Sequence, residues 1–268
     1  MTSAPEPLFG LEHIDWTALV DCRGDRGQIP ILLRWLWGTS ADLLDVTDNR
    51  GVRAIRDLEG RFVTSSDMLA CYCIRAATPP AVPFLVRLAQ DPRTLRRDLS
   101  LSLLLDIAVA VDAGPAGCWG QSWEEASALV RSAARGMART RPDGWFALLE
   151  ENPDRRVRGQ ILELLAIIHR SGLLDLLGRL WDSVLRATDA ISMTERVICL
   201  AYATAEHPEY RDRMRQPWAD MLQGWLRAND PAPRETAEAV SAALLHLPEW
   251  IDEETVRALR ELVQEQLP

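Results

Sequence analysis

The side chains that most often carry chemistry are scattered along this chain. Its four histidines, His13, His169, His207 and His246, stand far apart, and no His-Glu-x-x-His sequence occurs. A metal site needs several His, Cys, Asp or Glu side chains at ligand spacing. The sequence therefore predicts no metal site and no cofactor.

One acidic pattern does suggest a reaction. Asp42, Asp45 and Asp48 recur at intervals of three, which suggests the metal–diphosphate chemistry of all-helical prenyl enzymes. Their aspartate-rich motif, however, needs adjacent carboxylates and a second Asn/Ser/Glu motif, and both are missing. A solvated helix edge leading into the turn Asp48-Asn49-Arg50-Gly51 fits the pattern better. The nucleophile sequence Gly-x-Ser-x-Gly and a glycine-rich phosphate fingerprint are also absent.

The charged residues exclude several classes of enzyme. The 268-residue chain has no lysine, so all thirty of its basic residues are arginine. A Schiff-base lysine, a phosphate-loop lysine and a lysine general base are therefore excluded. The formal net charge is −9 and the pI is about 5.1, and a negative protein repels polyphosphates. These features favour a noncatalytic protein and make a nucleic-acid partner unfavourable.

Cysteine use and the first residues predict a cytoplasmic protein. The five cysteines are an odd number without a Cys-x-x-Cys pair, unlike a secretory disulfide framework. We expect Cys71, Cys73 and Cys199 to be small buried side chains within helices. The stretch Met-Thr-Ser-Ala-Pro-Glu-Pro-Leu lacks the basic and apolar regions of a signal peptide. No apolar run reaches the ~18 residues of a membrane span, so we expect no membrane partner.

The elements that position these side chains are predicted to be helices. Apolar residues recur at three and four throughout, and strict alternation is rare. In 155–170 the apolar stripe contains Val157, Ile161, Leu164, Leu165 and Ile168. Turn residues separate the stripes, as at Asp91-Pro92 and Asn152-Pro153. The pattern indicates an all-α fold of roughly a dozen helices.

A turn followed by an amphipathic helix returns along the chain. Counted from Pro153, an arginine stands at +5 and apolar residues stand at +8, +11 and +12. Pro92 and Ile191 start similar copies, and Pro231 starts a fourth in which the arginine moves to +3. The anchors 153, 191 and 231 are 38 and 40 residues apart. This period is the length of one helical hairpin in a HEAT or armadillo array.

These motifs resemble HEAT repeats, most clearly in 80–108, "PAVPFLVRLAQDPRTLRRDLSLSLLLDIA". The stretch "WTALVDCRGDRGQIPILLRWLWG" followed by "AVPFLVRLAQDP" is similar to HEAT-like proteins common in actinobacteria. The resemblance covers about residues 14–266. It implies one right-handed α-α superhelix over 1–268, with about six to seven helical hairpins after a flexible N-terminus, 1–13. It also implies that Arg97, Arg158 and Arg196 are structural, in a ladder between neighbouring repeats.

The period fails between Pro92 and Pro153, which are 61 residues apart. The excess lies in 112–139, where we expect a glycine-rich loop and an extra helix. Insertions in repeat arrays are often binding loops. Trp119 and Trp123 in this segment either contact a partner or pack against the array.

The most favoured function is a noncatalytic scaffold or regulatory module that binds a protein or peptide on its concave face. The outward polar positions of the second helices would include Asp98, Ser102 and Asp106, and also Gln160 and Glu163. Their negative bias suits a basic partner. The alternative is a HEAT-like DNA glycosylase or another enzyme acting on nucleic acid, because some such solenoids use Trp, Asp and Arg. The oligomeric state does not follow from the sequence.

Overall fold

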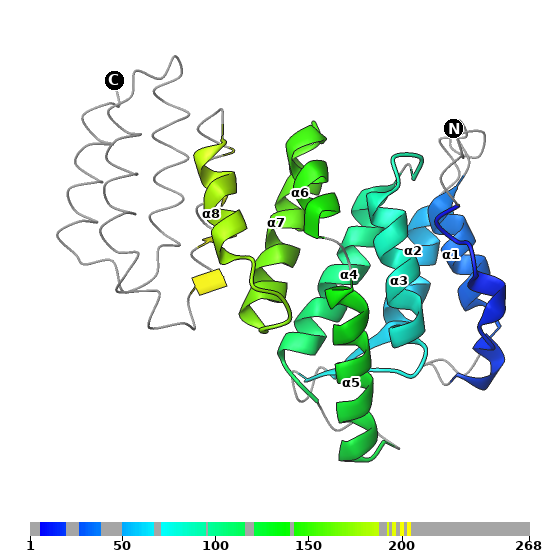
Figure 1. Ribbon diagram of the computed structural model, residues 1–268. Coiled ribbons are helices and arrows are strands. Elements are labelled where there is room, and N and C mark those ends of the chain that lie inside the picture. Colours follow the sequence, from blue (N-terminus) through cyan, green and yellow to red (C-terminus); the bar gives the residue numbers. More distant parts are fainter. Residues whose placement is uncertain are drawn as a thin grey trace. The chain divides into compact units, whose positions relative to one another are not determined.

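The structure is a computed structural model of the whole chain (Figure 1). The described residues are 6–19, 27–38, 50–66, 71–94, 96–115, 121–139 and 142–187, with 192, 195–196, 199–200 and 203–204. The chain divides into two compact units, Met1–Leu164 and Leu165–Pro268. Each unit is described by itself below, and the single continuous array stays a prediction of the sequence.

The fold is helical, as the apolar periodicity predicts. Its helices are α1 (Ile29–Trp37), α2 (Arg50–Phe62), α3 (Thr78–Gln90), α4 (Arg97–Asp112), α5 (Trp123–Ala138), α6 (Pro142–Glu151), α7 (Arg155–Arg170) and α8 (Leu177–Leu185). Two short 3₁₀ helices precede them, η1 (Leu11–His13) and η2 (Trp16–Ala18). Within the described ranges, every helix falls short of the length or apolar character that crossing a bilayer requires.

A small β-hairpin departs from the all-helical prediction. Strand β1 (Val63–Ser66) pairs antiparallel with β2 (Cys71–Ile74), and Val63 is opposite Ile74. The hairpin is tied to α2 and α3 at its base, because Thr78 Oγ1 donates to Phe62 O at 2.7 Å. The prediction that Cys73 is a helical thiol was wrong: it lies on β2, is buried, and forms a disulfide bond.

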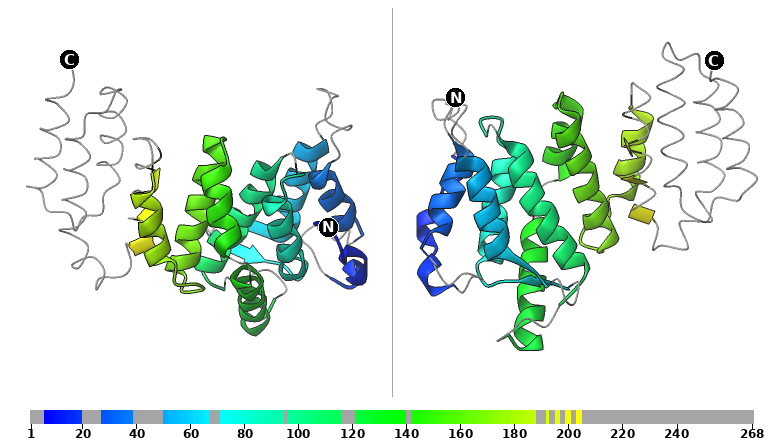
Figure 2. Two further views of the ribbon diagram at one scale, coloured as in Figure 1. Left: turned by 45° about the horizontal axis from the view of Figure 1, so that its top comes forward. Right: turned by 180° about the vertical axis from the view of Figure 1, so that it is seen from behind.

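The first unit contains two pairs of helices that lie side by side. Helix α1 packs on α2 and α3 packs on α4, while α1 also contacts α3 and α2 also contacts α4 (Figure 2). The positions at +8, +11 and +12 from Pro92 and Pro153 are all buried, as predicted: Ser100, Leu103, Leu104, Ile161, Leu164 and Leu165. All of these except Ser100 are apolar, and burial of apolar side chains is the main stabilising contribution to helix packing.

Helix α5 is the element that lies where the repeat period fails. It packs on α3 and α4 and projects beyond the ends of its neighbours (Figure 1). The expected capping box is present: Glu125 N donates to Ser122 Oγ at 3.2 Å, and Ser122 N donates to Glu125 Oε2 at 2.8 Å. These bonds satisfy two backbone donors that the first turn of a helix leaves free.

Part of the segment expected to be a flexible N-terminus is packed against the first unit. Leu11 in η1 is only 1% exposed, and Arg87 Nη1 on α3 donates to Phe9 O at 3.0 Å. The prediction for 1–13 was therefore wrong over its described part, because Leu8 and Leu11 supply apolar anchors.

In the second unit, the end of α7 and the turn before α8 are joined by a buried histidine. Leu176 N donates to His169 Nδ1 at 3.1 Å, and His169 is buried. Further along, Cys199 and Ala203 are buried, as expected for inner positions of the copy that Ile191 begins. Ile191 itself and the fourth copy, from Pro231, lie outside the described residues.

Candidate functional site

The predicted binding residues on α4 and α7 belong to one surface, which α2 completes. We define the acidic face as Glu59 on α2, Asp98, Ser102 and Asp106 on α4, and Gln160 and Glu163 on α7. The α4 residues follow one another at every fourth position, which places them on one side of that helix. The opposite side of α4 is buried through Leu103, Leu104 and Ile107. The local sequence therefore explains why these polar side chains point outward.

Asp98 already has partners within the protein. Arg96 donates to both of its carboxylate oxygens at 2.9 Å, and Arg156 Nη1 on α7 lies 3.8 Å from Oδ2. Partial burial opposes its ionisation, but the bonds and charge of Arg96, with the charge of Arg156, outweigh burial and lower the pKa of Asp98. Gln160 Nε2 also donates to Asp98 O at 3.2 Å. Asp98 therefore joins α4 to α7 and has little capacity left for a ligand.

The surroundings of Asp106 raise its pKa, whereas those of Asp98 lower the pKa of that residue. Loss of solvation, followed by the negative charges of Glu59 and Glu163, raises the pKa of Asp106 to about 6. Its side chain is nevertheless exposed, so the surrounding protein removes part of its water without enclosing it. Burial also raises the pKa of Glu59, against the charge of Arg56. Glu59 and Glu163, from two other helices, thus both oppose the ionisation of Asp106, and no described cation forms an ion pair with Asp106.

The other three predicted residues of this face are Ser102, Gln160 and Glu163. The Gln160 amide donates to Asp98 O, and its Oε1 is buried and accepts no hydrogen bond in the described part of the chain. Ser102 is half-buried between Asp98 and Asp106 along α4, and Glu163 is exposed on α7. The uncompensated carboxylates of Asp106 and Glu163 suit a ligand that brings donors and positive charge.

The three predicted ladder arginines do not share one role. Arg158 Nη1 donates to Asn152 O at 3.1 Å and Pro153 O at 3.0 Å, and Arg196 Nη1 donates to Ser183 O at 2.5 Å. All three bonds are made to backbone carbonyls, of the turn before α7 for Arg158 and of α8 for Arg196. Ser183 O also accepts from Arg186 N at 3.2 Å. Helix α4 is joined to α7 by Asp98 with Arg156 and Gln160.

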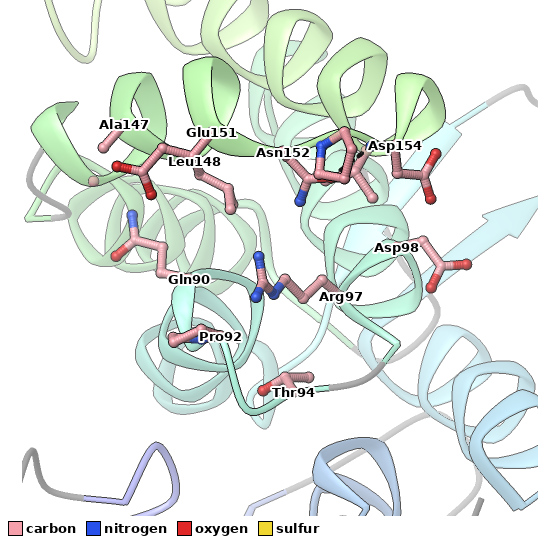
Figure 3. A pocket seen from close by; sticks show the side chains of 13 residues that line it. Gln90, Pro92, Thr94, Arg97, Asp98, Ala147, Leu148, Glu151, Asn152 and Asp154 are labelled. Atoms are coloured by element: carbon pink, nitrogen blue, oxygen red, sulfur yellow. Dashed lines mark hydrogen bonds between the residues drawn. The ribbon is translucent and has the colours of Figure 1, made fainter. Parts of the chain in front are cut away.

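Arg97 lines a groove of about 740 Å³ between the end of α3, the start of α4 and the α6–α7 turn. Figure 3 shows its side chain in the centre, between Gln90 and Asn152, while Asp98 points away at the edge. Among the described residues, Arg97 forms no hydrogen bond or ion pair. Thr94, which is 2% exposed, has an unpaired hydroxyl in the same groove. The described residues that line this groove include neither histidine nor cysteine.

The two tryptophans of the insertion have different outcomes. Trp119 lies outside the described residues. Trp123 is the first residue of α5 and is 65% exposed. Its exposure leaves the contact role open to test and does not favour the alternative of a packed side chain.

Sequence reasoning missed two features: one residue of the acidic face and a separate groove. Glu59 was not identified because it lies far from Asp106 in sequence, and only the packing of α2 on α4 brings it there. The second omission is a groove between α3 and α5, lined by Arg87, Arg135 and Arg139. Its signal was the spacing of arginines at every fourth position in α5. Among the described residues, no group of three or more His, Cys, Asp or Glu side chains could hold a metal ion.

Comparisons with known proteins do not add a precedent for this site. No protein-family model, no curated protein and no solved structure matches the chain. The geometry of its own residues is therefore what supports a functional proposal.

Proposed function

We propose that this chain is a noncatalytic HEAT-like scaffold that binds a basic protein or peptide segment on its acidic face. In this proposal the hairpins stack into a right-handed superhelix of about six to seven pairs, and the second helices line its concave side. The contacts of α1 with α3 and of α2 with α4 support this arrangement, because they place one helix pair beside the next. The link from Asp98 to Arg156 and Gln160 supports the same stacking for the next hairpin.

The observation that carries the proposal is the grouping of three carboxyl groups, Glu59 on α2, Asp106 on α4 and Glu163 on α7, with no described cation paired to Asp106. Lost solvation and the charges of Glu59 and Glu163 raise the pKa of Asp106 to about 6. Repulsion of this kind at the surface of a folded protein lowers its stability. An arginine or lysine of a partner placed among these groups removes the repulsion, and its N–H groups donate to the carboxylates.

A nucleic acid is a poor occupant of this surface. Its phosphates would meet the carboxylates of Glu59, Asp106 and Glu163, and the net charge of −9 adds long-range repulsion. No described feature of the acidic face favours the DNA glycosylase alternative. Cytoplasmic localisation stays a prediction of the sequence.

Binding of an arginine-rich test peptide, measured by fluorescence anisotropy, tests the proposal. The double variant Asp106→Asn/Glu163→Gln removes two charges from the acidic face without changing the side-chain shapes. Because an exposed ion pair is worth about 0.2–1 kcal/mol, we expect Kd to rise about two- to tenfold. The matched control is Glu12→Gln/Glu124→Gln, which changes the net charge equally at two exposed positions on η1 and α5.

The pH dependence gives a second readout. A bound cation favours the ionised form of Asp106, so affinity should fall as pH decreases through about 6. The Asp106→Asn variant should lose that component. Equal weakening by the control variant, or tighter binding of duplex DNA than of the peptide, would refute the acidic face as a site for basic partners.

A further inference from the structure

The structure also contains a surface of opposite charge. A groove of about 760 Å³ lies between α3 and α5, the helix within the insertion. We call it the α3–α5 groove. Its apolar wall includes Pro79, Pro83 and Val86 from α3, and its polar wall includes Arg135 and Arg139 from α5. It is separate from the acidic face, which α2, α4 and α7 provide.

A glycine sets how closely the two helices approach. A Cβ atom at Gly136 on α5 would lie 3.2 Å from Val82 Cγ1 and 3.8 Å from Pro79 O on α3. Only a residue without a side chain fits this approach without a shift of the neighbours. The same absence of a side chain leaves open the part of the groove that Gly136 lines.

The described lining of the groove carries only positive charge. Arg87, Arg135 and Arg139 line it, and no described aspartate or glutamate does. Among the described ion pairs, none joins these three arginines to a carboxylate. Such a concentration of positive charge attracts an anionic group.

Arg87 is held in place by neutral groups. Its Nε donates to Pro83 O at 3.2 Å, its Nη1 donates to Phe9 O at 3.0 Å, and its guanidinium lies 4.6 Å from the centre of the Phe84 ring. These contacts fix its orientation without neutralising it. Burial lowers the pKa of Arg87, as expected for a partly desolvated cation without an anion beside it.

Arg135 adds further donors. Its Nε donates to Arg131 O at 3.3 Å, which leaves its two terminal nitrogens for a ligand. The Gln90 amide adds none, because it faces Gly144 on α6, where a Cβ atom would lie 3.0 Å from Gln90 Nε2. Fixed guanidinium groups are suited to carboxylate oxygens.

We propose that the α3–α5 groove binds an acidic peptide segment of a partner protein. The carboxylates would pair with Arg87, Arg135 and Arg139, and an apolar side chain between them would pack on Pro83 and Val86. A peptide is favoured over a nucleic acid because the groove combines its positive charge with an apolar proline wall. The net negative charge of the chain also disfavours a polyanion that extends beyond the groove.

A labelled peptide of alternating glutamate and leucine, titrated with the full chain, tests this site by anisotropy. The variant Arg135→Gln/Arg139→Gln should raise Kd about tenfold, because two charge-assisted contacts are lost. The control Arg34→Gln/Arg53→Gln makes the same change of net charge at exposed positions on α1 and α2, and should leave Kd within about twofold. Circular dichroism checks that each variant is folded.

A second variant separates the groove from general attraction between charges. Ser132 is exposed on α5 and lines the groove, so Ser132→Trp should block it without changing the charge. Weaker peptide binding by both groove variants, with an unchanged control, supports the proposal. Equal effects of the control and the arginine variant, or unchanged binding by Ser132→Trp, would overturn it. Stronger competition by single-stranded DNA or inorganic phosphate than by the unlabelled peptide would overturn the assignment to a peptide.

Discussion

Replacing Asp106 by asparagine should stabilise the protein at neutral pH. The carboxyl has an ordinary pKa of 3.8, and lost solvation with the charges of Glu59 and Glu163 raises it to about 6. A difference of this size corresponds to about 3 kcal/mol for a fully enclosed group. Because Asp106 is exposed, screening by water and salt reduces the expected gain to about 1 kcal/mol. For a unit of this size, that gain raises Tm by about 2–4 °C.

The sign of the effect follows from the raised pKa. The folded protein binds the Asp106 proton more tightly than the unfolded chain does. Protonation of Asp106 therefore adds to the free energy of unfolding, and this contribution is complete below pH 3.8. The contribution is lost as pH rises through about 6. The difference in Tm between Asp106→Asn and the wild type should therefore be largest above pH 7 and should vanish near pH 4.

Thermal unfolding followed by circular dichroism at pH 4 and pH 7.5 measures both ends of this range. Glu163→Gln removes one of the two charges that act on Asp106, so it should give a smaller gain with the same pH dependence. A Tm for Asp106→Asn that is lower than wild type at pH 7.5, or equally shifted at both pH values, would refute this account. A confirmed gain would show that the carboxylates of the acidic face lower the stability of the protein, as expected of a binding surface.

Two further predictions concern the insertion helix and its surroundings. Replacing Gly136 by valine should destabilise the protein by about 1–3 kcal/mol in urea unfolding, since its Cβ would meet Val82 at 3.2 Å. Gly159→Ala on α7 should stabilise it by about 0.5–1 kcal/mol, since the space around that Cβ is open; similar effects of the two substitutions would contradict the packing described. Ser122→Ala should cost about 1 kcal/mol by removing the N-cap of α5, and faster amide hydrogen exchange in the first turn of α5 measures it. Ser127→Ala in the same helix is the control, and an equal increase in exchange there would argue against the cap.

The helices and their inner sides were predictable because both depend on local patterns. The apolar stripe of α7, from Val157 to Leu165, is buried as its spacing predicts. Ser122 and Glu125 form their capping box within a single turn. Such features need no knowledge of distant residues, since a helix repeats every 3.6 residues and its caps lie within one turn.

The β-hairpin was missed for the corresponding reason. The runs at 63–66 and 71–74 are short, and a short apolar run does not distinguish a strand from a buried helix. Pairing of Val63 with Ile74, together with the bond from Thr78 to Phe62 O, decides the conformation. These contacts depend on where α2 and α3 place the ends of the segment.

The partners of the arginines also could not be predicted from their spacing. Arg158 and Arg196 occupy the same +5 position as Arg97, but they bond to carbonyls, whereas Arg97 faces a groove. A long side chain with five donors reaches several acceptors from one backbone position. The arrangement of the nearby turn and helix ends selects among them.

The amino-acid sequence by itself determined the helical class, the buried positions of α4 and α7 and the side of α4 that carries Asp98 and Asp106. The reason is that periodicity and caps act over a few residues. Tertiary structure alone decided which charges meet. It paired Asp98 with Arg96 and Arg156, placed Glu59 and Glu163 near Asp106, and set α5 against α3 to form a positive groove. Electrostatic interactions act through space between residues that are distant in sequence. They could therefore be identified only once the packing of the helices was known.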